Sequence, residues 1–362
     1  MTTLPADQVT TYLLPPAAYT EQSWFDRERE QLFENTWVFC GVEHDLAAPG
    51  DFLTIDVGRS PIVVVRDGDD GLRAFHNICR HRGLLLVDDA GNCGKGLVCP
   101  YHRWNYGLDG SLRSVPQRDQ YPELDYSQLG LHAVRCETWK SLVFVNLDPE
   151  AETLDSWMGD LGSQLEGFHP ESLVEISTLE HPVASNWKLY VENHVDWLHL
   201  WYIHAGSLSQ YHHSSGERRE FGRHWTSFEP INEEPDPAVD PGGLHPIPGL
   251  SALEASNGAH FIFPSLTLFT NAGYWMLGQV VPEAPDRFTL RLRIFAVPGS
   301  DPAGFDEVIE TVMHEDYAVA EAIQKALRSP AFEVGPLASS YEREIMRFHR
   351  HYLHYVDSVD QP

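Results

Sequence analysis

Hydrophobic and polar positions alternate over short distances in the first part of the chain. Between residues 38 and 147, runs rich in Val, Phe and Tyr are separated by Gly, Asp and Asn turns, a pattern typical of antiparallel strands. The runs are PIVVVRD, GLRAFHNIC, GLVCPYHRWNYGLDGSLRS and SLVFVNLD. Residues 20–36 precede them and predict a helix, with Thr20 as its cap and Trp24 among its apolar positions. The pattern therefore predicts a small antiparallel β domain over residues 38–150.

Longer elements follow. Helices are predicted over residues 149–168 and over 187–204, a stretch free of Gly and Pro. Residues 229–249 are rich in Gly, Pro and Asp and predict a long loop. Three strands come next, HFIFPSLTLFT, YWMLGQVVPE and DRFTLRLRIFAV, and then two helices, 304–328 and 339–356. Strands combined with long helices indicate an α+β second domain.

Composition excludes several classes of protein. The 362 residues contain no run of eighteen apolar residues, so we expect no membrane span, and the first residues do not resemble a secretory signal. The formal charge of −28 argues against nucleic acid and anionic membranes as partners. Five Cys residues in a chain without a signal favour a reducing compartment, and we expect a cytoplasmic location.

The most informative motif is Cys79-x-His81, followed after seventeen residues by Cys99-x-x-His102. Two thiolates and two imidazoles on two loops are what a Rieske-type [2Fe–2S] cluster requires, with two Cys on one iron and two His on the other. A structural zinc site accepts the same ligand types. Spacing favours the cluster, because a zinc finger commonly groups its two Cys and then its two His.

Charge is uneven around this motif. Seven basic and three acidic residues lie between positions 73 and 118, a local excess of +4 in an acidic chain. The simplest interpretation is an ordinary surface. The functional alternative is that these residues attract an acidic redox partner and favour the reduced cluster.

A second set of candidate ligands lies downstream. Asp196, His199 and His204 stand on the predicted helix 187–204, and Asp316 stands on a later one. Two His and one carboxylate form the facial triad of non-haem Fe(II) oxygenases, which leaves positions open for O₂. Because His199 and His204 are five residues apart, a loosened last turn would help both to reach one metal. Taken alone, paired His on a Trp-rich helix are more often core or surface residues.

With these motifs, the chain resembles the catalytic α subunits of the Rieske non-haem iron oxygenases, the aromatic-ring-hydroxylating family. The resemblance spans CRHRG, CPYHRW, SNWKLYVENHVDWLHLWYIH, HEDYAVAEAIQ and GPLASSYEREIMRFHRHY. It implies a Rieske domain over 38–150 and a helix-grip catalytic domain over 1–37 and 151–362. The residue assignments that it implies are cluster ligands Cys79, His81, Cys99 and His102, iron ligands His199, His204 and Asp316, and catalytic residues Asp196 and Asn193. Asp196 is expected to hydrogen-bond His102 of the partner subunit.

Two positions depart from the family, and one spacing selects a branch. Arg103 stands where Gly is usual, and Leu198 stands where Tyr is common. The spacing within ENHVD is similar to that of the carnitine and glycine-betaine monooxygenases and is one residue shorter than in the naphthalene-type enzymes. This implies the branch without β subunits, which forms a homotrimer.

The expected function is that of a terminal oxygenase. It would use O₂ and electrons to hydroxylate, dihydroxylate or demethylate a small organic substrate, either an arene or a quaternary ammonium compound. No G-x-G-x-x-G segment is present, so NAD(P)H is expected to act through a separate reductase, with or without a ferredoxin. Seven aromatic residues are candidates for the pocket: Trp197, Trp201, Tyr202, Phe261, Phe263, Phe269 and Trp275. The alternatives are an electron-transfer protein with a non-catalytic second domain and a zinc-stabilised binding module.

Overall fold

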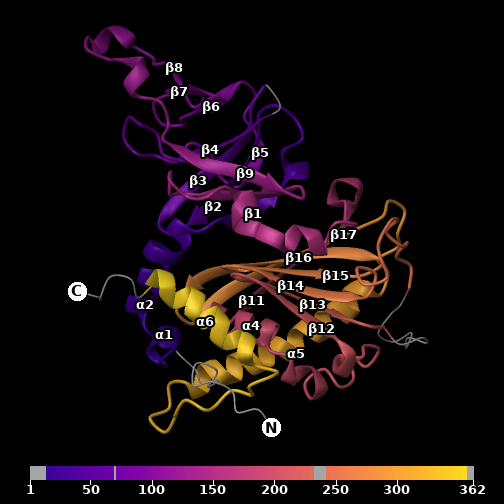
Figure 1. Ribbon diagram of the computed structural model, residues 1–362. Helices are drawn as coiled ribbons and strands as arrows, with labels where there is room; N and C mark the ends of the chain where they lie inside the picture. The colour runs from indigo at the N-terminus through magenta and orange to yellow at the C-terminus, as the bar shows by residue number, and fades with distance from the viewer. Residues whose placement is uncertain (1–13, 69–70, 232–241, 357–362) are drawn as a thin grey trace. The chain divides into compact units, whose positions relative to one another are not determined.

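Three antiparallel sheets, two of seven strands and one of three, organise the described part of the chain. A computed structural model describes residues 14–68, 71–231 and 242–356. The chain forms two compact units, one of residues 28–157 and one of residues 1–27 together with 158–362 (Figure 1). Each unit contains a sheet of seven strands, and the second adds long helices. The predicted α+β class is confirmed.

The first unit combines two antiparallel sheets. The larger has the order β1-β10-β9-β4-β3-β2-β5, and the smaller has the order β6-β7-β8. The strands of the larger sheet are β1 (Val38–Val42), β2 (Asp51–Val57), β3 (Ser60–Arg66), β4 (Leu72–His76), β5 (Ala90–Asn92), β9 (Ala133–Trp139) and β10 (Leu142–Asn146). The smaller sheet consists of β6 (Gly96–Val98), β7 (Asn105–Gly107) and β8 (Leu112–Ser114).

A hydrophobic core in this unit holds the two Cys/His loops. Val63 on β3 and Phe75 on β4 pack in one cluster of buried side chains with Trp104, and Cys79 and Cys99 belong to the same cluster. Each of these Cys residues follows closely on a strand, β4 or β6. The loops that carry the proposed cluster ligands are therefore anchored to packed strands at their first ligand.

The predicted helix over residues 20–36 is wrong as one continuous element. The segment forms α1 (Ala17–Thr20), α2 (Gln22–Arg27), a π-helical turn (Glu28–Leu32) and a 3₁₀ turn (Phe33–Asn35). Thr20 ends α1 and does not cap a following helix, because its hydroxyl donates to the Pro16 carbonyl at 3.0 Å.

The second unit has a sheet with the order β11-β17-β16-β15-β14-β13-β12, in which every pairing is antiparallel. Its strands are β11 (Val174–Val183), β12 (Glu217–Phe221), β13 (His224–Glu229), β14 (Asn257–Ile262), β15 (Leu266–Thr270), β16 (Tyr274–Ala284) and β17 (Arg287–Ala296). The helices α4 (Trp187–Val195), α5 (Phe305–Ala326) and α6 (Arg343–Val356) lie on the same side of this sheet (Figure 1).

Several predicted elements have different limits in the structure. The helix predicted over 149–168 is only α3 (Leu154–Met158) followed by 3₁₀ turns, and α6 begins at Arg343 instead of residue 339. The loop predicted over 229–249 begins after β13, and its residues 232–241 lie outside the described residues. The helix predicted over 304–328 is present as α5, whose buried side chains recur at spacings of three and four residues from Phe305 to Gln324.

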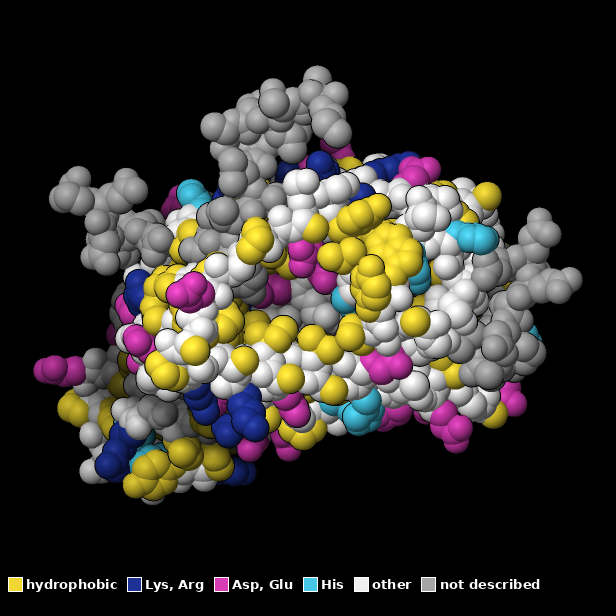
Figure 2. All heavy atoms as spheres, turned by 90° about the horizontal axis from the view of Figure 1, so that it is seen from below, with side chains coloured by type: hydrophobic (Ala, Val, Ile, Leu, Met, Phe, Trp, Pro, Cys, Tyr) yellow, Lys and Arg dark blue, Asp and Glu magenta, His cyan; other side chains and the backbone are white. Residues whose placement is uncertain are grey.

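Two expectations drawn from the composition, an acidic surface and no membrane span, can be compared with the structure. Acidic side chains are dispersed over the face drawn in Figure 2 and do not gather in one patch. Within the described residues, no helix is both long and apolar enough to cross a membrane.

Candidate metal centres and active site

The four predicted cluster residues lie on two loops with the same local geometry. In the first loop, the Gly83 amide donates to the Cys79 carbonyl at 2.9 Å, and in the second the Arg103 amide donates to the Cys99 carbonyl at 3.0 Å. The residue that closes each loop has a positive φ, 75° at Gly83 and 60° at Arg103. Glycine adopts this left-handed conformation without strain, which is a physical reason for a Gly at the position of Arg103.

Side chains from these loops converge. The rings of His81 and His102 lie 4.7 Å apart, and Trp104 stacks on His81 at 4.8 Å with an interplanar angle of 4°. His81 Nδ1 is buried and has no hydrogen-bond partner among the described residues. An orphaned imidazole nitrogen beside a second imidazole and two buried Cys residues fits a metal cluster bound between the loops.

Burial sets the protonation preferences of these candidate ligands. It raises the pKa of the Cys79 thiol, and burial, followed by the charges of His102 and Arg82, lowers the pKa of His81. His81 is therefore held as the neutral imidazole that a metal requires, whereas the Cys79 thiolate needs a cation to stabilise it. Tyr106 contributes a further polar group, since its hydroxyl lies 3.5 Å from Cys79 Sγ and accepts the Arg80 amide at 3.0 Å.

The basic residues around this site fall into two groups. Four contact acidic side chains or backbone carbonyls, and these are Arg73, Arg80, Arg113 and Arg118. Arg82, Lys95 and Arg103 are exposed and have no ion-pair partner in the described part of the chain. Cys93 donates its thiol to the Gly50 carbonyl at 3.2 Å, which accounts for it as a structural residue of the turn.

The second candidate site joins the end of α4 to α5. His199, His204 and Asp316 place one ligand atom each within 4.8 Å of one another. Asp316 Oδ1 lies 3.7 Å from His199 Nε2 and 2.9 Å from His204 Nε2. The same oxygen is buried between the two imidazoles. Two imidazole nitrogens and one carboxylate oxygen converging on a buried point fit a mononuclear iron.

The predicted helix 187–204 is wrong beyond Val195, and this departure forms the site. Asp196 has an extended backbone, with φ −74° and ψ 130°, and its Oδ1 accepts the Leu198 amide at 2.7 Å. This side-chain turn competes with the helix and ends it. A 3₁₀ turn (Leu198–Trp201) follows, so His199 does not share a helical face with Asp196.

Carboxylates also lie behind both histidines. Glu315 Oε2 lies 2.8 Å from His204 Nδ1 and accepts the Ser207 hydroxyl at 2.5 Å. Asp196 Oδ2 lies 3.5 Å from His199 Nδ1. The Glu315 carboxylate fixes the tautomer of His204 in which Nε2 carries the lone pair, as outer groups commonly do for metal-bound His, whereas His199 Nδ1 makes no hydrogen bond within the described residues. Glu315 was missed by the sequence reasoning, because neighbouring helical residues usually point to different faces.

Electrostatics within the site favour an anionic Asp316. Burial disfavours the charged carboxylate, but His204 and His199, together with Asn193, outweigh it and lower the pKa of Asp316. Burial likewise opposes the charged form of His204, while Asp316 and Glu315 raise its pKa. His194 behaves differently, since burial lowers its pKa to about 4 and it donates to the His260 carbonyl at 3.0 Å. His194 is thus a neutral wall of the site.

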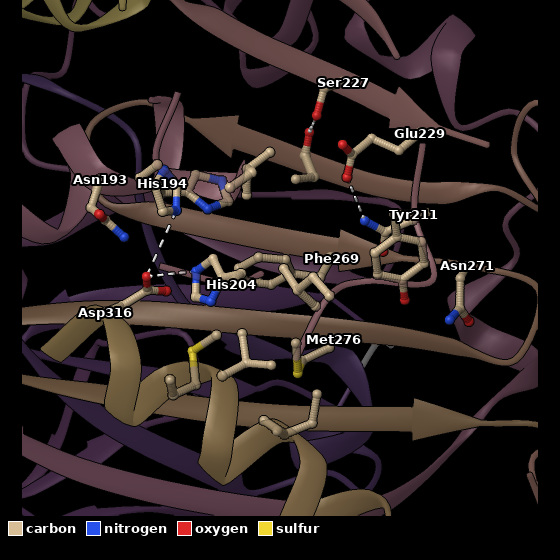
Figure 3. A pocket seen from close by; sticks show the side chains of 18 of the residues that line it. Asn193, His194, His204, Tyr211, Ser227, Glu229, Phe269, Asn271, Met276 and Asp316 are labelled. Atoms are coloured by element: carbon tan, nitrogen blue, oxygen red, sulfur yellow. Dashed lines mark hydrogen bonds and ion pairs between the residues drawn. The ribbon is translucent and has the colours of Figure 1, made fainter. Parts of the chain in front are cut away.

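A cavity of about 140 Å³ adjoins the triad. Figure 3 shows Asn193, His204 and Asp316 at one end, Phe269 and Met276 along its length, and polar side chains at the other end. The polar residues at that end are Tyr211, Ser227, Glu229 and Asn271. Glu229 is buried there and bonds His213 Nδ1 at 2.6 Å and Asn257 Nδ2 at 3.2 Å.

Only some of the predicted pocket aromatics line this cavity. Trp197 and Phe269 do, and they are joined by Tyr211, Trp225, Tyr274 and Phe305, which the sequence reasoning did not name. Of the others, Phe261, Phe263 and Trp275 are core residues, Trp201 packs on Tyr341, and Tyr202 is 74% exposed. Strand residues alternate between two faces, and without the sheet register the sequence does not show which face meets the cavity.

These two sites on this fold define an iron-dependent oxidoreductase with a Rieske domain and a separate catalytic domain. Residues 36–133 match the model of the Rieske [2Fe-2S] domain, and residues 170–358 match the catalytic domain of the ring hydroxylating alpha subunit. The chain therefore belongs to the family of ring-hydroxylating α subunits, the catalytic components of the Rieske oxygenases. Its members are oxygenases, and the predicted enzyme class is confirmed.

Individual relatives agree with this family. The chain is 28% identical to choline monooxygenase of Spinacia oleracea over 358 residues, which cover 92% of this chain and 76% of the relative. It is 38% identical to the large oxygenase component of the naphthalene 1,2-dioxygenase system of Pseudomonas aeruginosa, over 52% of this chain and 43% of the relative. The structure of the quaternary ammonium Rieske monooxygenase CntA with L-carnitine shares the fold, with a TM-score of 0.82, 21% identity, and coverage of 98% and 100%.

Proposed function

We propose that this oxygenase hydroxylates a small organic cation that carries no carboxylate. The observation that carries this proposal is the charge of the cavity. Glu229 lines it at the end away from the triad, Asp196 and Asp316 lie beside the proposed iron, and no Lys or Arg is found among its described lining residues. Such a wall attracts a cation and offers an anionic substrate group no partner.

In this proposal the two candidate sites hold the iron. Cys79, His81, Cys99 and His102 would bind the [2Fe–2S] cluster, and His199, His204 and Asp316 would bind Fe(II). A ferrous ion held by these three ligands would supply open positions for O₂ and its reduction chemistry next to the substrate. The overall reaction consumes R–H, O₂, two electrons and two protons and yields R–OH and water.

The chain's own residues orient and shield the substrate. Met276 and Phe269 form an apolar passage between the triad and the polar end of the cavity, and they keep water from the reacting carbon. The Glu229 carboxylate would attract the substrate cation, while its bond to His213 at 2.6 Å fixes its position. Gln210 Oε1 lines the same cavity and is buried without a hydrogen-bond partner among the described residues, so it is an acceptor for a substrate hydroxyl.

Cavity size limits the substrate further. An apolar cavity of roughly 150 Å³ accommodates benzene. The volume of about 140 Å³ here therefore suits a small trialkylammonium alcohol or a single ring and excludes a polycyclic arene unless the cavity expands. A small neutral arene is the second candidate, since aromatic walls bind cations and arenes alike.

Electrons are proposed to reach the cluster from a separate reductase, directly or through a ferredoxin. Arg82 and Arg103, exposed on the two cluster loops without an acidic partner in the described chain, suit an acidic donor. We propose that Asp196 then connects to His102 of the partner subunit in a homotrimer. The cytoplasmic location stays a prediction.

The substrate proposal is tested with three molecules of nearly the same shape. Choline is the cation, 3,3-dimethyl-1-butanol is its neutral carbon isostere, and glycine betaine carries a carboxylate. We expect substrate-coupled O₂ uptake with choline and a kcat/KM lower by roughly tenfold or more for each of the other two. Equal turnover of choline and its isostere, or better turnover of benzene than of choline, would contradict a cation-specific site.

A matched pair of variants tests whether the negative charge of Glu229 binds the substrate cation. Glu229→Gln keeps the shape of the side chain and removes the charge, so KM for choline rises while the kinetics of the neutral isostere change little. Glu217→Gln, at an exposed position on β12, is the control and leaves both unchanged. An equal effect of Glu229→Gln on both compounds would assign Glu229 to structure alone.

The link between the sites is tested at Asp196. In Asp196→Asn the amide oxygen still accepts the Leu198 amide and preserves the turn, but the second acceptor is lost. We expect the cluster and the iron to be retained while turnover falls by roughly two orders of magnitude or more. Near wild-type coupled turnover would exclude the bridging role. A protein with two irons per chain and no O₂ uptake would be the electron-transfer protein instead.

A further inference from the structure

A second group of possible metal ligands lies outside the catalytic site. His181 on β11, with Glu310 and His314 on α5, places one ligand atom each within 4.8 Å of one another. β11 and α5 lie side by side in the second unit (Figure 1). We propose that His181, Glu310 and His314 form a site for a divalent cation of the zinc type, separate from the catalytic iron.

His181 is the fixed member of the group. Its side chain is 12% exposed, and its Nε2 atom is buried and makes no hydrogen bond within the described residues. That atom faces Glu310 Oε1 at 3.7 Å. A buried imidazole nitrogen without a hydrogen-bond partner is uncommon, and a cation between it and the carboxylate would satisfy it.

Glu310 and His314 supply the adjustable ligands. They are four residues apart on α5, so they share one helical face. The His314 Nδ1–H donates to the Glu310 carbonyl at 2.7 Å, the kind of backbone hydrogen bond that leaves Nε2 as the lone-pair atom of a metal-bound His. The side chains of His314 and Glu310 are 65% and 36% exposed, so both have room to contract around an ion.

An ordinary helical ion pair explains only part of this arrangement. Glu310 and His314 alone would be a common surface pair worth a few tenths of a kcal/mol. It gives no reason for the third group, the buried His181 nitrogen, to point at the same carboxylate. Two imidazoles and one carboxylate with an open side toward water match the ligand set of an open zinc site, with water as the fourth ligand.

The proposed site and the catalytic triad use different faces of α5. His314 stands two residues before Asp316, which corresponds to a rotation of about 200° around the helix. A cation bound by His181, Glu310 and His314 would tie α5 to β11 without occupying the catalytic cavity, whose described lining includes none of the three. We therefore expect zinc to raise the melting temperature, by on the order of a few degrees.

Equilibrium dialysis of the iron-loaded full chain against Zn²⁺, with zinc and iron counted together, tests the proposal. We expect one zinc per chain with no loss of iron, and a zinc affinity lower by roughly tenfold or more in His314→Ala and in Glu310→Gln. The control is His169→Ala. His169 is also 65% exposed and lies 3.2 Å from the carboxylate of Glu171, but it belongs to no such group of three in the described chain. This variant should bind zinc as the wild type does.

Three results would overturn the proposal. Zinc binding that is unchanged in His314→Ala and Glu310→Gln would place the ion elsewhere. Zinc uptake matched by an equal loss of iron would assign it to the catalytic triad. No zinc retained by the wild type at micromolar concentrations would leave the three residues as a surface pair beside a buried His. Circular dichroism of each variant shows whether it is folded, and the exposed His314 makes its substitution the safest for the fold.

Discussion

Exchanging glycine and a larger residue at the last position of each proposed cluster loop should have opposite effects on the two loops. Gly83 and Arg103 close these loops with φ values of 75° and 60°. A side chain at such a position costs about 1–2 kcal/mol, and a glycine loses about 0.5–1 kcal/mol through its freer unfolded chain. Arg103→Gly should therefore stabilise its loop by about 1 kcal/mol, and Gly83→Ala should destabilise the other loop by a similar amount.

Two competing effects, a steric clash and the loss of the Arg103 charge, can be separated from backbone strain. A Cβ placed on Gly83 meets no atom within 4 Å, so Gly83→Ala tests backbone strain without a clash. Arg103→Ala removes the same charge and side chain as Arg103→Gly but keeps the strain, and it is the matched control. At position 103, the difference between Arg103→Gly and Arg103→Ala reports the backbone strain.

Loss of the visible absorbance of the cluster in a fixed concentration of guanidinium measures opening of the loops. About 1 kcal/mol changes an equilibrium constant roughly fivefold. We expect absorbance loss to be about five times slower in Arg103→Gly than in Arg103→Ala, and about five times faster in Gly83→Ala than in the wild type. Equal rates for the two Arg103 variants would refute the strain argument. If Arg103 contributes to docking of the reductase, both of its variants should also lose turnover driven by the reductase. Both should keep the single turnover that follows chemical reduction with dithionite.

Three further predictions concern single side chains. A hydrogen bond from the Tyr106 hydroxyl to Cys79 Sγ would favour the reduced cluster, which carries one more negative charge. Tyr106→Phe removes this hydroxyl, so the midpoint potential of the cluster should fall by on the order of 20–60 mV in a redox titration. An unchanged potential would show that the hydroxyl does not donate to the sulfur. Glu315→Gln should weaken iron retention against a chelator by roughly 10–100-fold without changing the cluster spectrum, whereas the exposed Glu307→Gln on the same helix should not; similar iron loss from both would remove Glu315 from the site. Burial, followed by the charge of Glu220, raises the pKa of Glu344 from 4.5 to about 7. The protonated Glu344 therefore stabilises the fold fully below pH 4.5, and this contribution is lost as pH rises through 7. The melting temperature of Glu344→Gln should rise relative to that of the wild type over this pH range, and a constant difference between the two would contradict the shift.

The features that could be predicted from the sequence are those that depend on residues close together along the chain. Cys79-x-His81 and Cys99-x-x-His102 each stand on one loop, so they could be proposed as cluster ligands before any fold was known. The strand and helix patterns together likewise predicted the α+β class. Both depend on residues within a few positions of one another.

Long-range geometry and side-chain turns were not predictable in this way. The helix predicted to residue 204 ends at Val195, because the Asp196 carboxylate accepts the Leu198 amide. A single Asp within an apolar pattern does not predict such a turn. Glu315 lies beside His204 only through the packing of α5 against the segment after α4. Glu229 reaches the cavity through the register of β13, which no local pattern encodes.

The central claim is that His199, His204 and Asp316 hold an iron with an open position beside the substrate cavity. Nitric oxide, a stable substitute for O₂, tests this directly when added to the anaerobic ferrous protein. We predict an S = 3/2 signal in the EPR spectrum of the wild type, and its loss in Asp316→Ala while the signal of the reduced [2Fe–2S] cluster remains. An S = 3/2 signal that persists in Asp316→Ala, or its absence from an iron-loaded wild type, would contradict the claim.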